Sequence, residues 1–265
     1  MTTRQSDVPI DSQLLPPLPG SRYTAEAWSP AALKHAADTL LRIPFFAALS
    51  AEQLAQLAPA ITTRHFARGD VVIDQDGHDS ALYVLARGRA HVLRTSPEGR
   101  EVILDILVPG AHAGEMCLID NQPHSATVRC LEACVWLRIE GAPLARCLAA
   151  DPRLSYTLMH ALVQRLRRAH RQITALALLD VPDRVMQCLR EYAEPGPDGV
   201  PLVRERLRRQ DLARLTGASR EMVSRVLLRL EAEGHVRTLP NGAMQIRSPH
   251  PLPAASAAGR RQDRS

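Results

Sequence analysis

The chain has 265 residues, of which 45% are hydrophobic and 3% aromatic, and its 33 basic and 28 acidic residues give a formal net charge of +5 at pH 7. This composition is typical of a globular protein and excludes a disordered or fibrous chain. No apolar run approaches the ~18 residues that a membrane span requires, and residues 1–21 lack the apolar centre of a signal peptide, so we expect a cytoplasmic protein without membrane contact.

The cysteines indicate a reducing environment. There are five of them, without a C-x-x-C pair: Cys117, Cys130, Cys134, Cys147 and Cys188. This pattern argues against a zinc ribbon or a cysteine-ligated cluster, so we expect small core residues. Residues 1–116 contain no cysteine at all, which excludes an N-terminal iron–sulfur sensor.

Residues 1–40 are rich in proline and polar residues, and residues 251–265 are small, polar and basic, so both ends are predicted to be flexible tails. In the entry to the first domain, Ser50 is expected to cap a short helix that turns Leu54 and Leu57 inward.

A β-rich block follows, with apolar runs at 71–73, 81–86, 90–93, 101–107, 126–131 and 134–139. Turn signals separate these runs roughly every 8–12 residues, as in an antiparallel sandwich, jelly roll or barrel.

The sequence period changes after Asp151-Pro152. The chain then runs to Leu179 without glycine or proline, which predicts one long helix of roughly 40 Å at 1.5 Å per residue. Apolar residues recur along it at steps of three and four: Leu158, Leu162, Leu166, Ala169, Ile173 and Leu176. This heptad-like seam favours packing of two copies into a homodimer. The alternative is a single long helix buried on its own sheet. Asp180-Val181-Pro182 ends the helix.

The net charge lies in the last third of the chain. Residues 1–180 hold 18 basic and 18 acidic residues, whereas residues 181–265 hold 15 basic and 10 acidic ones, so 15 − 10 = +5. A polyanion is the partner that this asymmetry indicates. Arginine usage alone does not explain it, although Lys34 is the only lysine and arginine replaces lysine throughout.

Residues 208–234 have the pattern of a helix-turn-helix. Gly217 provides the tight turn, and Ser219 caps a recognition helix predicted over 219–232. Four side chains of its first turns are expected to contact base edges in double-stranded DNA: Arg220, Glu221, Ser224 and Arg225. Arg209 and Ser219 would contact phosphates. Asn241-Gly242 predicts a hairpin wing. The alternative is an ordinary surface helix pair with a Glu221–Arg225 ion pair.

Five features follow one another along the chain: IPFFAALS, the turns at Gly69, Gly77 and Gly88, the cassette GEMCLIDNQPHSATV, ALLDVPDR at the end of the long helix, and SREMVSRVL. With these features in this order, residues 41–248 resemble the cyclic-AMP receptor/FNR (CRP/FNR) family of bacterial transcription regulators. The resemblance implies an α+β protein with a β-roll effector domain (41–150), a dimerisation helix (151–180) and a winged helix-turn-helix (181–250). It also implies a homodimer on a palindromic, TGTGA-like site, with RNA polymerase as a further partner.

The resemblance also implies an effector pocket. Gly114, Glu115 and Ser125 match residues that contact the ribose and the phosphate in the family. His124 occupies the position of the arginine that contacts the phosphate. Ala169 and His170 occupy the positions of the Thr-Ser pair that contacts adenine. An imidazole with a pKa near ~6.5 holds a phosphate less well than a guanidinium. This disfavours cyclic AMP and leaves a cyclic dinucleotide, haem, another small effector or constitutive DNA binding open. His124 and His170 could equally be polar residues of an unused pocket.

Two other classes are less compatible with the sequence. A cupin-type metalloenzyme needs an H-x-H pair on facing strands, and no two of the ten histidines are two residues apart, which leaves only His112 with Glu115. No sequence motif of a catalytic nucleophile or a phosphate-binding loop is present, so we do not expect an enzyme. A cyclic-nucleotide module that regulates a partner protein would not need the basic winged helix.

Overall fold

The structure, a computed structural model, describes residues 26–27, 43–47, 49–196, 199–203 and 207–247. The chain divides into two compact units, Met1–Arg167 and Arg168–Ser265. The predicted tails lie outside the described residues except at β1 (Glu26–Ala27). This short strand pairs antiparallel with β2 (Ile61–Phe66), where it uses the free backbone edge of that strand. The expectation of a flexible tail is therefore wrong at these two residues.

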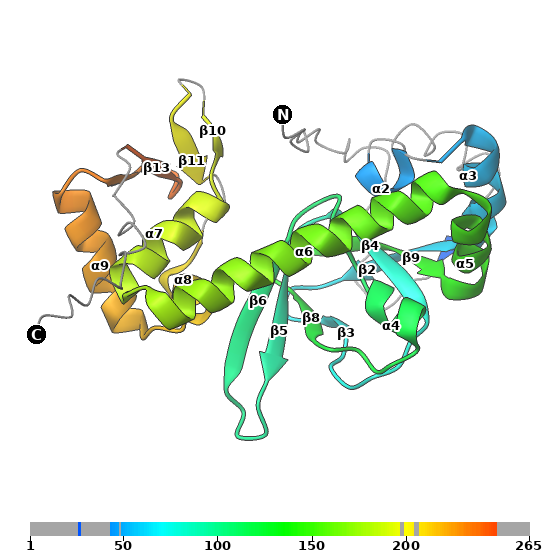
Figure 1. Cartoon of the computed structure of the whole chain (residues 1–265), viewed down its shortest axis with the longest axis horizontal. Helices are drawn as coiled ribbons and strands as arrows, with labels where there is room; N and C mark the ends of the chain where they lie inside the picture. The colour runs from blue at the N-terminus through cyan, green and yellow to red at the C-terminus, as the bar shows by residue number, and fades with distance from the viewer. Residues whose placement is uncertain (1–25, 28–42, 48, 197–198, 204–206, 248–265) are drawn as a thin grey trace, which may run out of the picture. The chain divides into compact units, whose positions relative to one another are not determined.

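The first unit is a β-roll of two antiparallel sheets (Figure 1). One sheet has the order β1-β2-β9-β4-β7, and the other has the order β3-β8-β5-β6. The remaining strands are β3 (Val71–Ile73), β4 (Ala81–Arg87), β5 (Ala90–Thr95), β6 (Glu101–Leu107), β7 (His112–Ala113), β8 (Thr127–Cys130) and β9 (Cys134–Glu140). All of them except β7, which no predicted run covers, coincide with the predicted apolar runs, and the α+β architecture is confirmed.

Side-chain alternation along the central strands builds two cores. On β9, Val135 and Leu137 join a cluster with the helices, whereas Cys134 and Trp136 join a cluster between the two sheets. Successive residues of a strand point to opposite faces, so both faces of this strand are apolar because both are covered. Trp136 is fully buried inside the roll.

Short helices cover the outer face of the first sheet. They are α2 (Pro44–Ala47), α3 (Ala51–Leu57), the 3-10 turn η1 (Ala58–Ala60), α5 (Gly141–Ala150) and the first turns of α6 (Pro152–Leu178); α4 (Glu115–Asp120) lies in the cassette. The predicted cap and inward residues are confirmed, because the Ser50 hydroxyl accepts from the Gln53 amide at 3.2 Å and Leu54 and Leu57 are buried. None of the described helices is long and apolar enough to span a bilayer.

The cysteines behave as predicted. Four are buried, and Cys147 is half-buried against the helical core; no described cysteine forms a disulfide. In the roll, the Cys134 thiol lies 3.2 Å from the carbonyl oxygen of Arg89, to which it donates.

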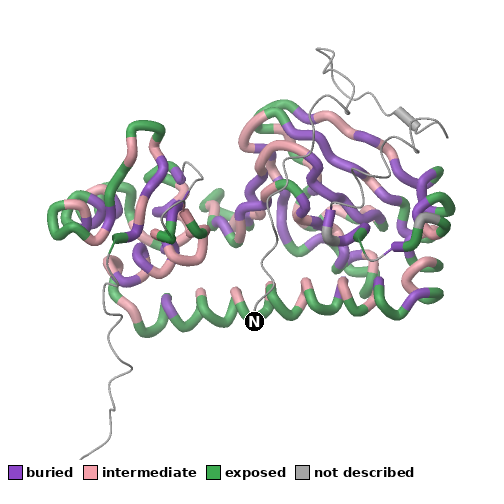
Figure 2. The backbone as a smooth tube through the Cα atoms, turned by 90° about the horizontal axis from the view of Figure 1, so that it is seen from above, coloured by how far each residue is buried: buried purple, intermediate pink, exposed green. Residues whose placement is uncertain are grey.

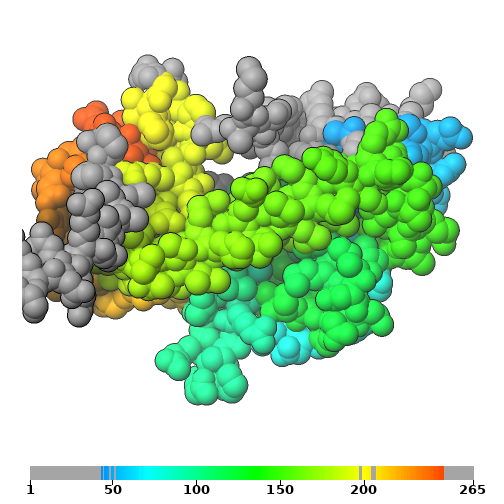
Figure 3. All heavy atoms as spheres, in the orientation of Figure 1, coloured from blue at the N-terminus to red at the C-terminus, as the bar shows by residue number. Residues whose placement is uncertain are grey.

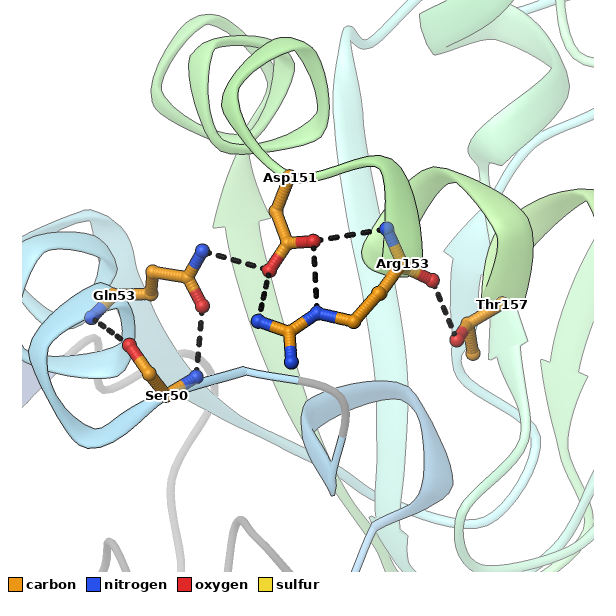
Figure 4. Close-up of polar contacts among 5 residues, drawn as sticks. All are labelled: Ser50, Gln53, Asp151, Arg153 and Thr157. Atoms are coloured by element: carbon orange, nitrogen blue, oxygen red, sulfur yellow. Dashed lines mark hydrogen bonds and ion pairs between the residues drawn. The ribbon is translucent and has the colours of Figure 1, made fainter.

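A polar network joins α3 to the start of α6 (Figure 4). The Asp151 carboxylate accepts from the Gln53 side-chain amide at 2.8 Å and from the Arg153 backbone amide at 2.8 Å, and it forms an ion pair with the Arg153 guanidinium. Hydrogen bonds from Gln53 and then from Arg153 lower the pKa of Asp151 from 3.8 to about 2. The carboxylate thus caps α6 and anchors it to α3.

Asp151→Asn is expected to lower the melting temperature at neutral pH and to reduce the loss of stability in acid. A carboxyl group with a depressed pKa contributes stability above its unfolded pKa, near 3.8, and this contribution is lost as the pH falls through about 2. Thermal unfolding from pH 7 to pH 2 would measure this. Glu140→Gln, at an exposed position, is the control. Equal acid sensitivity of both variants would contradict the assignment.

The helix α6 carries a long exposed surface (Figure 2). Its first turns enter the core of the roll through Leu154 and Leu158, which are 0% and 5% exposed. The prediction that Leu158 belongs to a dimer seam is therefore wrong, because its side chain already packs in this core. Leu162 is half-buried.

The exposed apolar stripe lies about one residue position further round the helix. It runs at steps of three and four through Tyr156, Met159, Val163, Leu166 and Ile173, with His170 at the position between the last two. We call this set the α6 stripe. Figure 3 shows the helix at the surface of the face in view.

The second unit is a winged helix-turn-helix. It contains α7 (Val181–Glu191), β10 (Glu194–Pro195), β11 (Pro201–Val203), α8 (Arg209–Thr216), α9 (Arg220–Ala232), β12 (Val236–Thr238) and β13 (Met244–Ile246). The break predicted at Asp180 is confirmed, since its carboxylate caps α7 by accepting from the Asp183 amide at 3.0 Å. The strands form one antiparallel sheet, β10-β11-β13-β12.

Candidate nucleic-acid interface and effector cassette

The turn between α8 and α9 positions the recognition helix. Gly217 has a φ of 62°, in the left-handed region that a side chain would strain, and the Ser219 hydroxyl accepts from the Met222 amide at 3.1 Å. Leu212 of α8 and Val223 and Val226 of α9 are buried at the helix crossing. This packing fixes which face of α9 remains exposed.

The predicted base-reading side chains lie on that face. Arg220, Glu221 and Arg225 are exposed, and Ser224 is half-buried; Arg209 is exposed at the start of α8. The structure contains no Glu221–Arg225 ion pair, although it does contain an Arg229–Glu233 pair at 2.7 Å. The surface-pair alternative thus lacks the contact on which it depended. The guanidinium groups of Arg220 and Arg225 have no carboxylate partner among the described residues.

The wing follows directly. Val236 pairs with Ile246 across β12 and β13, and the Gly242 amide donates to the Leu239 carbonyl at 2.8 Å in the turn. The Asn241 side chain accepts from the Ala243 amide at 3.0 Å, so the Asn-Gly turn has the role that its sequence predicts.

The effector cassette begins at Gly114, which has a φ of 91°. A Cβ atom on this residue would lie 2.5 Å from the Ala81 carbonyl oxygen, so the position requires glycine. Glu115 follows and is 1% exposed. One of its carboxylate oxygens accepts from Arg165 of α6, which also donates to the His112 carbonyl, and the other oxygen is buried without a partner.

His124 and Ser125 close the cassette. The His124 amide donates to the Gly77 carbonyl at 2.8 Å, and its side chain is 6% exposed with Nε2 unpartnered. Burial lowers the pKa of His124, and the charge of Asp79 opposes this effect. A histidine with a lowered pKa is mainly neutral at pH 7, so it supplies little charge to a phosphate.

Sequence reasoning missed three arginines near this cassette. Arg165 binds Glu115, Arg138 forms an ion pair with Asp79 at 2.9 Å, and Arg94 donates to the Ser125 carbonyl at 2.9 Å. Arginines occur throughout the chain, so no pattern marks these three. Ala169 and His170, predicted to complete the pocket, are exposed on α6 in the second unit.

No three His, Cys, Asp or Glu side chains in the described ranges are grouped so that they could hold a metal ion. His112 is buried behind the first sheet, where its ring lies 5.8 Å from that of Phe45. Arg165 contacts both Glu115 and the His112 carbonyl, and no third His, Cys, Asp or Glu of the described residues joins these two as a ligand.

Comparison with known proteins decides the family. A cyclic nucleotide-binding domain matches residues 63–151, and a Crp-like helix-turn-helix domain matches residues 183–254. The cyclic AMP receptor protein of Thermus thermophilus is 31% identical over 204 residues, which are 77% of this chain and 92% of that protein. The chain belongs to the CRP/FNR family of transcription regulators.

Two further relatives agree. The cAMP-activated global transcriptional regulator Vfr of Pseudomonas aeruginosa is 32% identical over 189 residues, 68% of this CRP/FNR-family chain and 86% of Vfr. The structure of the c-di-GMP responsive global regulator CLP of Xanthomonas campestris matches with a TM-score of 0.62 and 26% identity, and covers 75% of this chain and 100% of CLP. These relatives are named as regulators rather than enzymes, in line with the expectation from the sequence.

Proposed function

We propose that this CRP/FNR-family protein binds DNA as a homodimer, reads a palindromic TGTGA-like site with α9, and is controlled by a small effector in the β-roll. The observation that carries the proposal is the first two turns of α9, where Arg220, Glu221 and Arg225 are exposed and none of them forms an ion pair with another. Their polar groups are therefore available to base edges.

The chemistry of these side chains fits base recognition. An arginine can donate to O6 and N7 of guanine, and a glutamate can accept from N4 of cytosine, each contributing about 1–3 kcal/mol of discrimination. The Ser219 oxygen already accepts from the helix, so its own proton can be donated to a phosphate, and Arg209, exposed at the start of α8, would contact a further phosphate. Such contacts make binding salt-dependent.

The α6 stripe supports a dimer of two parallel α6 helices. Met159, Leu166 and Ile173 are 55%, 56% and 64% exposed, and apolar side chains at these steps are typical of a coiled-coil seam. Two recognition helices related by a two-fold axis would bind half-sites about 34 Å apart, one turn of DNA.

An effector in the roll would act through the cassette. Arg165 of α6 binds Glu115 there, so a ligand that engages Glu115 would favour one arrangement of α6 over another. A cyclic nucleotide or dinucleotide is the favoured class, and the hinge at Asp180 would pass the change to α7. RNA polymerase is the further partner that we propose.

Fluorescence anisotropy tests the proposal. The purified protein is titrated onto a TGTGA-type palindrome and a scrambled duplex at fixed salt, with and without cyclic AMP or cyclic di-GMP. We expect tighter binding to the palindrome. Binding without nucleotide would indicate constitutive regulation, and equal affinity for the two duplexes under every condition would contradict the proposed half-site.

Arg225→Ala is expected to relax specificity at one base position by about 1–3 kcal/mol. Arg209→Ala is expected to weaken binding to all sequences alike and to reduce the salt dependence by the equivalent of about one phosphate contact. Competition with duplexes substituted at single positions separates the two effects. If Arg225→Ala lowered the affinity for every duplex equally, its assignment to base reading would be wrong.

A further inference from the structure

The effector cassette lacks a charged side chain of its own for a phosphate. Position 124 holds a buried histidine whose pKa is lowered, and two neighbouring arginines are already bound to carboxylates, Arg138 to Asp79 and Arg165 to Glu115. Each of these pairs has no net charge. An anionic ligand at the cassette would therefore need a different cation.

Arg94 brings such a cation from β5, the strand that pairs with β8 at the end of the cassette. Leu93 of β5 lies opposite Thr127 of β8, so Arg94 lies beside the residues that lead into β8. There its guanidinium donates to the Ser125 carbonyl oxygen, 2.9 Å away, and thus touches the cassette itself.

The guanidinium of Arg94 is also available to bind an anionic ligand. It is exposed, and its one recorded contact is the neutral Ser125 carbonyl, without a carboxylate partner among the described residues. An arginine has five N–H donors, so one bond to a carbonyl leaves the fork able to hold a phosphoryl group.

Glu115 supplies the second half of the site. One of its carboxylate oxygens is buried and has no partner, although Arg165 engages the other. A buried acceptor without a donor is costly, and a ligand hydroxyl would satisfy it. The cassette therefore presents an acceptor for a hydroxyl and, from β5, a cation for an anion.

We infer that Arg94 of β5, rather than a residue of the cassette, is the residue of the effector site that binds the phosphate of a phosphodiester ligand. This inference rests on the proposed function only in placing the effector in the roll. It replaces the family's expected contact at position 124, in the loop before β8, with one from β5.

Isothermal titration calorimetry on the full chain tests it with three probes: cyclic AMP, cyclic di-GMP and adenosine, which has hydroxyls but no phosphate. We expect at least one of the two phosphodiesters to bind more tightly than adenosine. Arg94→Ala should weaken that binding by about tenfold or more and reduce its salt dependence. Arg94→Lys should restore part of the affinity, because it keeps the charge without the fork.

Adenosine separates a phosphate contact from a structural role. Loss of the bond to Ser125 could loosen the cassette, but this would weaken adenosine binding equally, whereas loss of a phosphate contact would leave it unchanged. Arg100→Ala removes another exposed arginine of the same hairpin and should have no effect. Unchanged phosphodiester affinity in Arg94→Ala, or a wild-type protein that binds neither phosphodiester more tightly than adenosine, would overturn the inference.

DNA binding by the same variants, measured without nucleotide, distinguishes a failure of this inference from a failure of the proposed function. Phosphodiester binding that depends on Arg94 in a protein without sequence-specific DNA binding would leave this inference standing and remove the proposed function. Specific DNA binding, together with phosphodiester binding that does not depend on Arg94, would leave the proposed function standing and remove this inference.

Discussion

The double variant Leu166→Glu, Ile173→Glu is expected to be monomeric and to bind a palindromic operator about 100-fold more weakly or worse. Two half-site contacts in one dimer gain roughly 10²–10⁴ in affinity from their linkage, and this gain is lost when the dimer separates. Both side chains lie on the α6 stripe and are more than half exposed in the single chain, so the substitution leaves the core of each protomer intact.

Sedimentation equilibrium and anisotropy on the same samples measure the two effects. Gln164→Glu adds charge to an exposed position of α6 away from the stripe and should change neither the mass nor the affinity. A double variant that remains a dimer would show that the α6 stripe is not the interface. A monomer with wild-type affinity would show that a single recognition helix suffices.

The second large expected effect is a pH dependence of the folding stability that His112 causes. Burial, and then the charge of Arg165, lowers its pKa from 6.5 to about 4, with Glu115 acting in the opposite direction. Its Nε2 atom is buried without a partner. The folded state thus keeps the ring neutral, while the unfolded chain takes up a proton near pH 6.5. Stability should be complete above that pH and decline as the pH falls from 6.5 towards 4.

The size of the decline follows from the shift. A difference of 6.5 − 4 = 2.5 pKa units corresponds to roughly 3 kcal/mol once the pH is below both values. His112→Phe places an apolar ring beside Phe45 and should remove this contribution to the pH dependence; His112→Leu serves if the larger ring does not fit. Urea unfolding at pH 7.5 and pH 4.5 measures it. His78→Gln, at an exposed histidine, is the control. An unchanged pH dependence in both His112 variants would contradict the assignment.

Much of this architecture could be predicted because local chemistry and tertiary structure agree. The strands of the roll lie between glycine and proline turns, and Ser219, Gly217 and Asn241 have the roles that their residue types favour. The sequence does not predict the helix α5, because its first residues, Gly141-Ala-Pro, are typical of a turn or a loop. Proline is nevertheless well tolerated in a first helical turn.

The register of the dimer seam could not be predicted from leucine spacing alone. Leu158 and Leu166 fit one stripe in sequence, but the roll covers the side of α6 that contains Leu158, and this shifts the exposed stripe to Met159 and Val163. Periodicity reports that a face is apolar and does not say which neighbour covers it.

The effector site was predicted only where the cassette is continuous in sequence. Gly114, Glu115 and Ser125 lie within one short segment, but Arg165 reaches it from α6 and Arg94 from β5, the strand paired with β8. Such contacts depend on strand register and helix packing, which no local pattern encodes.

The buried cysteines have a practical consequence. All five thiols are buried or half-buried, so maleimide dyes should react with them slowly in the folded protein. A single cysteine introduced at the exposed Arg237 of β12 could then be labelled selectively without a cysteine-free background. Energy transfer between two such labels would report the separation of the two wings in a dimer directly in solution.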